Sequence, residues 1–322
     1  MTQTISSPPP IVARLAPSPT GALHLGNARS FLIAWLSARS QGGRVILRIE
    51  DIDSPRVKPE AVQQIYDDFR WLGLDWDDGP YVQTERMERY EVALDSLRQA
   101  NAIYPCVCSR TDIENAASAP HLEHEPPTYP GTCRGRGHVA PEGVPFAWRF
   151  RTTNQRIGWT DGFRGPQEFT LDQVGGDFVV WKSSRSGGGG PIRPTPAYQL
   201  AVVVDDAAMG VTEVVRGDDL VPSTPRQILL YKQFGWTLPR FFHVPLVVGS
   251  DGRRLAKRHG DLKLQTLRSR GASAEALLGW LAWTCGWLPA GSRIGIRDLV
   301  AMFRWDTIPR ESVTLEAMPN LV

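Results

Sequence analysis

Hydrophobic residues in the first 50 positions fall into two alternating patterns. Ile11–Ala16 is a short apolar run that stops at a proline, which is typical of a buried strand, and Arg44–Ile49 has the same character. Between them, Gly26–Gln41 carries its large apolar residues on one face and ends at a Gly-Gly pair, which predicts an amphipathic helix. The order of strand, helix and strand predicts the start of a parallel α/β sheet, with ligands at the strand ends.

Helical spacing returns twice before residue 102 and again near the C-terminus. Pro59–Leu72 and Thr84–Asn101 are predicted amphipathic helices, the second with Thr84 as its N-cap. A further helix is predicted at Ser223–Phe234. The C-terminal part of the chain, which contains the strongly apolar Ala274–Trp283, is also expected to be helical.

The middle of the chain has a different texture. From about residue 102 to residue 190 there are more prolines and glycines and short alternating segments such as Phe146–Arg151 and Phe178–Trp181. This pattern indicates a mostly β insertion. Within it, Ser183–Pro194 contains four consecutive glycines, and we expect a mobile loop there because glycine has the largest ordering entropy.

Composition places the chain among soluble globular proteins. Of its 322 residues, 42% are hydrophobic and 22% are charged, enough for a substantial core. The longest apolar runs, such as Ala201–Val204, are far shorter than the ~20 residues that cross a bilayer, so no membrane association is expected. The N-terminus has neither a basic nor an apolar segment, which argues against a secretory signal and favours a cytoplasmic protein.

Two segments have the residue types of a phosphate site. In APSPTGALHLGNAR, residues 16–29, His24, Gly26 and Asn27 lie where the first helix should begin, and helix N-termini bind phosphates through unpaired N–H groups. The second segment is Arg253–Gly260, which belongs to a strongly basic stretch although the net charge of the chain is only +2. A basic loop of this kind can close over a triphosphate. Taken alone, each segment has a structural alternative: His24 could simply cap the helix, and Arg253–Gly260 could be a solvated basic turn.

Three of the four cysteines lie close together in the insertion. Cys106 and Cys108 are one residue apart and Cys133 ends a Gly-containing turn, so their thiolates can supply three corners of a tetrahedral zinc site. The local candidates for the fourth ligand are His121, His124, His138 and Tyr129. Zinc chemistry alone favours a histidine. Buried free cysteines are the alternative, and Cys285 is interpreted as a core residue.

Together, these motifs resemble those of class I aminoacyl-tRNA synthetases. HLGN at His24–Asn27 is similar to their HIGH signature, and LAKRHG at Leu255–Gly260 is similar to a diverged KMSKS signature. The glutamyl branch is the most similar, because its further motifs follow in the same order. These are APSPTG before HLGN, RIEDID (48–53), LGLDWDDGP (72–80), YQLA (198–201) and VVRGDDL (214–220). The resemblance covers roughly residues 11–287.

The resemblance implies an α/β fold: a Rossmann-type parallel-sheet catalytic domain, a β-rich zinc-containing insertion and a C-terminal helical region that contacts the tRNA stem. The expected division of the chain is a disordered tail (1–10), the first half of the catalytic domain (11–101), the insertion (102–190), the second half of the catalytic domain (191–250), and the KMSKS-like loop with the helical region (251–322).

The resemblance also implies roles for individual residues. The expected L-glutamate site consists of Arg14, Ser18, Glu50, Tyr198 and Arg216, with Glu50 at the ammonium. The expected catalytic residues are His24, Asn27 and Lys257, and those that bind ATP with its Mg²⁺ are His24, Gly26 and Lys257. Arg216 is our choice for the side-chain carboxylate, because a planar guanidinium binds a carboxylate with two hydrogen bonds.

For the cysteine cluster, the resemblance selects Cys106, Cys108, Tyr129 and Cys133 as the ligands of one structural zinc ion. One departure concerns the KMSKS-like motif, in which Lys257 matches the second lysine but Arg254 stands at the first. Arginine keeps the charge but not the compact ammonium, so a modest change in ATP handling is expected.

The length of the chain bears on its partners. Because it stops at Val322, we expect no anticodon-binding domain. This short architecture resembles the glutamyl-Q tRNA(Asp) synthetases, a branch that activates glutamate and attaches it to queuosine in the anticodon loop of tRNA(Asp). The expected partners of a monomeric enzyme are therefore L-glutamate, ATP and queuosine-bearing tRNA(Asp). The alternatives are a short glutamyl-tRNA synthetase that charges the 3′ end of tRNA(Glu), and a catalytically lapsed paralogue that binds tRNA.

Overall fold

The computed structural model describes residues 10–52, 57, 59–116, 128–185, 192–253, 255, 262–315 and 321. Among the described residues, none of the helices combines the length and apolar character needed to cross a membrane. Two of the residues singled out by the sequence, Lys257 and Arg254, lie outside the described part of the chain, as do His121 and His124.

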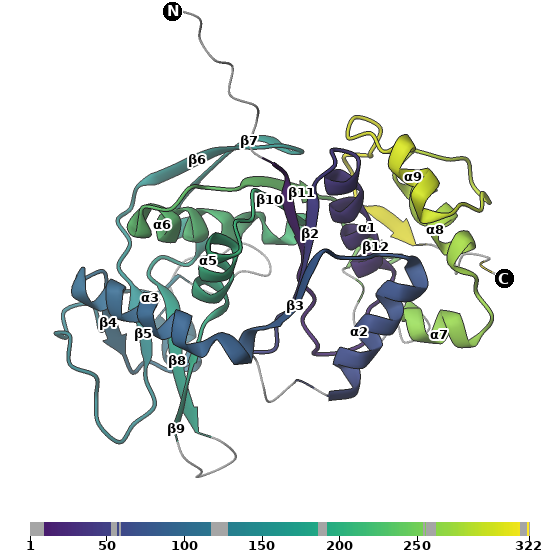
Figure 1. The fold of residues 1–322 in the computed structure, drawn as a ribbon. Helices are drawn as coiled ribbons and strands as arrows, with labels where there is room; N and C mark the ends of the chain where they lie inside the picture. The colour runs from purple at the N-terminus through teal and green to yellow at the C-terminus, as the bar shows by residue number, and fades with distance from the viewer. Residues whose placement is uncertain are drawn as a thin grey trace, which may run out of the picture.

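A parallel sheet forms the centre of the molecule (Figure 1). Strands β1 (Val12–Leu15), β2 (Arg44–Ile49) and β3 (Asp78–Val82) pair in that order. Strands β10 (Glu213–Gly217) and β11 (Arg240–Val244) form a second parallel pair beside β1. Because these strands run in one direction, the carboxyl ends of β1, β2 and β10 lie at a common edge of the sheet, as the predicted α/β fold requires.

Both faces of this sheet are covered. Ile46 and Leu47 are adjacent on β2 and point to opposite faces, and each belongs to a different hydrophobic cluster. Helix α1 (Leu25–Arg39) is buried along most of its length between the sheet and the C-terminal segment. The remaining helices of this region are α2 (Pro59–Leu72), α3 (Met87–Gln99), α5 (Tyr198–Ala208) and α6 (Thr224–Phe234), with short 3₁₀ helices at Gln83–Arg86 and Asp218–Ser223.

The predicted N-cap of the third helix is wrong. Helix α3 begins at Met87 after the 3₁₀ helix Gln83–Arg86, and its start has no side-chain cap. Thr84 instead uses its hydroxyl and its backbone N–H to donate to the carboxylate of Asp51, at 2.6 and 2.9 Å. The side chain of Thr84 therefore makes a longer-range contact with the end of β2 instead of capping the helix.

The segment predicted as an insertion, residues 102–190, is β-rich, and its sheet continues beyond the predicted boundary at residue 190. Strands β4 (Ile103–Cys106), β5 (Ala147–Phe150), β8 (Phe178–Arg185) and β9 (Ile192–Pro196) form an antiparallel sheet beside the central one (Figure 1). A separate hairpin, β6 (Arg156–Asp161) and β7 (Gly165–Thr170), packs against β11. The helical elements of the insertion are α4 (Arg110–Ala116) and the 3₁₀ helix Leu171–Val174.

The mobile loop predicted at Ser183–Pro194 is wrong at both ends. Residues 183–185 belong to β8 and pair with residues 192–194 of β9 in an antiparallel ladder. The glycines themselves lie outside the described residues. Backbone hydrogen bonds between the strands therefore extend closer to the glycine run than its composition suggested.

The C-terminal segment is largely helical, as predicted, with α7 (Leu264–Ser269), α8 (Ala274–Thr284) and α9 (Ile296–Met302). It also contains a strand that the sequence did not predict. Strand β13 (Val313–Leu315) pairs in parallel with β12 (Val247–Gly249), which follows β11. Cys285, at the end of α8, is fully buried and is a core residue, as predicted.

Candidate active site

A cleft of about 1220 Å³ opens at the carboxyl edge of the central sheet. Its lining contains seven of the residues that the sequence singled out: Arg14, Ser18, His24, Asn27, Glu50, Tyr198 and Arg216. They come from β1 and the loop after it, the start of α1, the end of β2, the start of α5, and β10. The fold therefore brings together, around one space, residues that are up to 202 positions apart in the chain.

The start of α1 is organised by His24. Its Nδ1 accepts a hydrogen bond from the backbone N–H of Gly26 at 3.2 Å, and its own backbone N–H donates to Oδ1 of Asn27 at 3.2 Å. Because Nδ1 is an acceptor, the neutral imidazole carries its proton on Nε2. A Cβ atom at Gly26 would lie 3.2 Å from this imidazole, so a larger residue would crowd it.

The segment after the KMSKS-like motif reaches the same place. His24 and Lys263 form an antiparallel β-bridge, and Leu264 N donates to Leu23 O at 2.9 Å. Leu255 and Lys263 also line the cleft. The described residues on both sides of the stretch that contains Lys257 therefore line the same cleft as the start of α1.

Arg14 and Glu50 both line the cleft, and a buried arginine to which the sequence motifs assign no role connects them through Asp206. Arg48 is fully buried and donates to Glu50 at 3.0 Å and to Asp206 at 2.6 Å. Arg14 donates to Val215 O at 3.1 Å and lies 3.7 Å from Asp206. Burial raises the pKa of Glu50 above its usual value, although Arg48 and Arg14 act to lower it. A further cation beside Glu50 would offset the cost of its buried charge.

Arg216 is 6% exposed, and within the described residues its hydrogen bonds go to the uncharged groups of His243, Leu220 and Thr224. Nε donates to Nε2 of His243 at 3.0 Å, and Nη2 donates to Oγ1 of Thr224 at 2.9 Å. Its Nη1 is buried and has no hydrogen-bond partner among the described residues. Burial lowers the pKa of Arg216, and the nearby Arg14 adds to this effect. The guanidinium therefore favours an incoming carboxylate.

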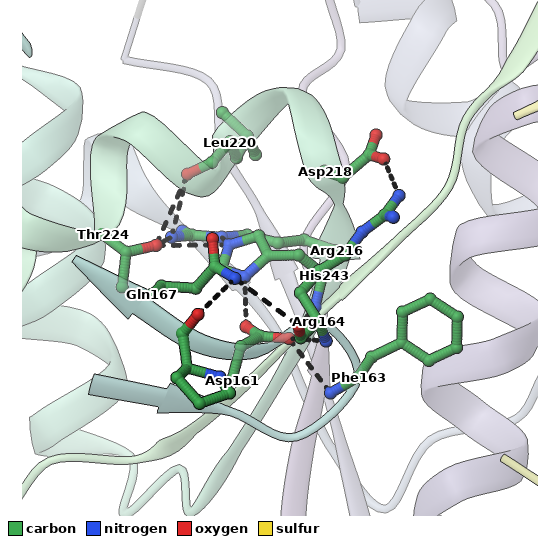
Figure 2. A network of polar contacts seen from close by, with 10 residues as sticks. Asp161, Phe163, Arg164, Gln167, Arg216, Asp218, Leu220, Thr224 and His243 are labelled. Atoms are coloured by element: carbon green, nitrogen blue, oxygen red, sulfur yellow. Dashed lines mark hydrogen bonds and ion pairs between the residues drawn. The ribbon is translucent and has the colours of Figure 1, made fainter. Parts of the chain in front are cut away.

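Sequence reasoning missed the residues behind Arg216 (Figure 2). His243 on β11 is fully buried, with Nδ1 2.5 Å from Oδ2 of Asp161. Asp161 lies at the end of β6 in the insertion. The available signals were a histidine inside the apolar run FFHV and an Asp-Gly turn after a short strand, and neither points to a site by itself.

Burial and the neighbouring guanidinium decide the charge of this pair. Burial lowers the pKa of His243 to about 4, with a contribution from Arg216 that Asp161 only partly opposes. Burial tends to raise the pKa of Asp161, yet the hydrogen bonds that it accepts, first from His243, hold it below the usual value. At neutral pH the pair is therefore a neutral imidazole and a carboxylate.

The three clustered cysteines form a separate site in the insertion. The Sγ atoms of Cys106, Cys108 and Cys133 all lie within 4.8 Å of one another, close enough to hold a metal ion. Cys108 Sγ and Cys133 Sγ are 3.6 Å apart, and the hydroxyl of Tyr129 lies 3.3 Å from Cys106 Sγ and 3.8 Å from Cys108 Sγ. Zn–S bonds of about 2.3 Å in a tetrahedron separate sulfur atoms by roughly 3.8 Å, so this spacing fits zinc.

Comparison with known proteins agrees with this architecture. Residues 10–317 match the family model described as tRNA synthetases class I (E and Q), catalytic domain. This chain belongs to that family. The solved structure of a glutamate tRNA ligase from Elizabethkingia meningosepticum, in complex with its amino acid, has a TM-score of 0.74 and 25% identity. The alignment covers 94% of this chain and 66% of that one.

Curated members of the synthetase family are more similar in sequence. A protein of Rhodopirellula baltica named glutamyl-Q tRNA(Asp) synthetase is 51% identical over 286 residues, 86% of each chain. Its counterpart in Symbiobacterium thermophilum is 47% identical and covers 95% of this chain and 96% of its own. Glutamate–tRNA ligase 2 of Halorhodospira halophila is 42% identical over 91% of this chain, but the match spans only 61% of that protein.

Proposed function

We propose that this synthetase activates L-glutamate with ATP and transfers it to queuosine in tRNA(Asp). The observation that carries the first half is the buried Nη1 of Arg216, a donor without a partner among the described residues, on a side chain that lines the same cleft as Glu50. Glutamate has two carboxylates and one ammonium, and the cleft has Arg14 and Arg216 for the former and Glu50 for the latter. Ser18 and Tyr198 are both exposed and would bind at the rim.

The nucleotide would bind at the start of α1. In this proposal His24 donates from Nε2 to a phosphate, Gly26 allows the close approach of the backbone, and Asn27 holds the turn. Lys257 would neutralise the leaving pyrophosphate, and Mg²⁺ bound with ATP supplies further positive charge. A glutamate α-carboxylate oxygen forms a bond to the α-phosphorus, and the bond to the pyrophosphate oxygen breaks, giving glutamyl-adenylate and pyrophosphate. The protein acts by positioning and by charge stabilisation.

The proposed acceptor of the glutamate is inferred from those relatives that align with this chain over most of their own length. A hydroxyl of queuosine attacks the mixed anhydride, and AMP leaves. Relatives named glutamyl-Q tRNA(Asp) synthetase align over 86% and 96% of their own chains. The alternative acceptor, the 3′ end of tRNA(Glu), is favoured by similarity to proteins named glutamate–tRNA ligase, of which this chain spans about three fifths.

In the insertion we propose one structural zinc ion held by Cys106, Cys108, Tyr129 and Cys133. Four protein ligands leave no open position, so this ion would stabilise the fold without taking part in the reaction. We also propose the division of the chain at residues 11, 102 and 251, a monomeric state and a cytoplasmic location. The second half of the catalytic domain would begin after β9, which pairs with β8 of the insertion, and not at residue 191.

Two experiments test the proposal in sequence. ATP–pyrophosphate exchange, run with glutamate and no tRNA, should proceed, whereas no exchange would favour the catalytically lapsed paralogue. Charging with radiolabelled glutamate is then compared on tRNA from cells with and without queuosine. Label that depends on queuosine supports the proposed acceptor, and label on queuosine-free tRNA supports the 3′ end of tRNA(Glu).

A further inference from the structure

We infer that the β6–β7 hairpin of the insertion positions the amino-acid site: Asp161 fixes His243 in the tautomer that orients Arg216. The inference rests on the proposed function only for the identity of the ligand, a substrate with a side-chain carboxylate. Neither Asp161 nor His243 lines the cleft, so both act through Arg216 and are positioning residues.

The hairpin is docked tightly on the strand that carries His243. Gly162 N donates to Phe241 O at 2.8 Å, and a Cβ atom at Gly162 would come within 2.2 Å of the ring of Phe242. At the other side of the turn, Arg164 pairs with Asp218, which directly follows β10 (Figure 2). The turn between β6 and β7 is thus attached to β11 and to the residue that directly follows β10.

Asp161 has a full set of hydrogen-bond donors. Its Oδ1 accepts from the backbone N–H groups of Phe163, Arg164 and His243, at 3.0, 2.8 and 3.1 Å. Its Oδ2 faces Nδ1 of His243 at 2.5 Å, and a carboxylate oxygen can only accept. The proton of the neutral imidazole must therefore sit on Nδ1.

The position of that proton decides whether His243 offers Arg216 a hydrogen-bond acceptor or a donor. With Nδ1 protonated, Nε2 of His243 is an acceptor and receives the Nε–H of Arg216. Together with the bond from Nη2 to Thr224, this fixes two of the three guanidinium nitrogens and hence its plane. The remaining nitrogen, Nη1, is the one without a partner among the described residues, and we assign it to the substrate carboxylate.

Asp161→Asn reverses this arrangement without changing the size of the side chain. Three backbone donors hold the amide oxygen at the Oδ1 position, so the NH₂ group faces His243. The imidazole must then accept at Nδ1 and carry its proton on Nε2, which places two N–H groups opposite each other at Arg216. His243→Gln is the matched variant, because its amide oxygen keeps an acceptor for Arg216 but has no tautomer to reverse.

ATP–pyrophosphate exchange and a spectroscopic measurement test the inference. In Asp161→Asn we expect the KM for glutamate to rise roughly 10- to 100-fold while the KM for ATP stays within about twofold. In the His243→Gln background, the same substitution should add almost nothing, so the double-mutant cycle should show strong coupling. Long-range ¹H–¹⁵N NMR spectra, with His243 assigned from its loss in His243→Gln, should show the proton moving from Nδ1 to Nε2.

The outcomes separate this inference from the proposed function. If the wild-type chain fails to exchange with glutamate but the tautomer shift occurs, the function is wrong and the positioning network stands. If wild type is active and Asp161→Asn shows an unchanged glutamate KM or an unchanged tautomer, the inference is wrong. Equal losses for glutamate and ATP, or additive effects in the cycle, would indicate a merely structural role and also overturn it. A thermal melt of each variant confirms that it is folded.

Discussion

The cleft and the cysteine cluster are assembled in opposite ways. The cysteine cluster gathers residues from Cys106 to Cys133, and their separations already match a tetrahedral ion. The cleft joins Arg14 on the first strand to Arg216 and Lys263, and it depends on the order of parallel strands. A local site needs little more than its own turn, whereas a site built across the sheet also needs the layers behind it to hold each charge in place. The two sites should therefore fail differently.

The largest expected effect is at Arg216. Arg216→Gln removes the buried cation that is proposed to bind the substrate carboxylate, and losses of 2–5 kcal/mol are usual when one partner of a buried charge pair is removed. We expect kcat/KM for glutamate in ATP–pyrophosphate exchange to fall about 1000-fold, with the KM for ATP nearly unchanged. Arg156→Gln, at a residue whose side chain is 75% exposed on β6, is the control and should behave as wild type. Similar losses for glutamate and ATP would remove Arg216 from the amino-acid side.

A smaller loss is expected for the nucleotide side. Lys257→Ala removes a positive charge that is proposed to act on the leaving pyrophosphate, and single electrostatic groups of this kind contribute about 100-fold or more. The exchange rate at saturating glutamate should fall by roughly that factor, while glutamate affinity is retained. Lys263→Ala, at the β-bridge to His24, tests whether any cation lining this side is sufficient. An unchanged rate in Lys257→Ala would exclude the residue from the reaction.

A substitution in the cysteine cluster should lower the stability of the protein more than its activity. Cys133→Ser removes one of the proposed zinc ligands, so the protein should contain well below one zinc per chain and melt several degrees lower, as expected for loss of a structural metal site. At low temperature glutamate activation should persist. Cys285→Ser, at a buried thiol outside the cluster, should keep its zinc. Full zinc content in Cys133→Ser would contradict the proposed ligand set.

Acid should weaken the fold through His243. Its pKa is about 4 in the folded state and near 6.5 when unfolded, so between these values the unfolded chain binds a proton that the folded chain does not. The contribution of neutral His243 to the free energy of unfolding is therefore fully present above pH 6.5. It falls by about 3 kcal/mol as the pH drops to 4. Urea unfolding across this window should show the slope, and His243→Gln should flatten it. An identical slope in that variant would assign the dependence elsewhere.

Asp68 is expected to have the opposite effect on the pH dependence of stability, lowering the free energy of unfolding as the pH rises. It is fully buried on α2, its oxygens have no hydrogen-bond partner among the described residues, and Arg268 lies 3.9 Å away. Burial raises its pKa to about 7, so its ionisation increasingly destabilises the fold as pH rises from about 4 to 7. Asp68→Asn should therefore gain about 2 kcal/mol more stability at pH 8 than at pH 5, measured by urea unfolding. An equal gain at both values would contradict the shifted pKa.

The features that the sequence predicted correctly are either local patterns along the chain or motifs shared with a known family. The apolar spacing of residues 12–49 predicted the first strands and helix, and the cysteine spacing predicted the cluster. Strand β13 was missed because three residues carry little periodicity and their partner lies 66 positions away. His243 was missed for a related reason. Its role comes from Asp161, on a strand that pairs with neither β10 nor β11, and no motif joins the two.

The close docking of Gly162 on β11 has a consequence for how such enzymes can be re-engineered or diversified. A module inserted between two halves of a catalytic sheet invites exchange for the module of a relative. Here a swap that altered the turn after β6 would also remove Asp161, the group that we infer fixes the tautomer of His243. Exchange of this unit is therefore limited to variants that keep an aspartate and a glycine at that turn.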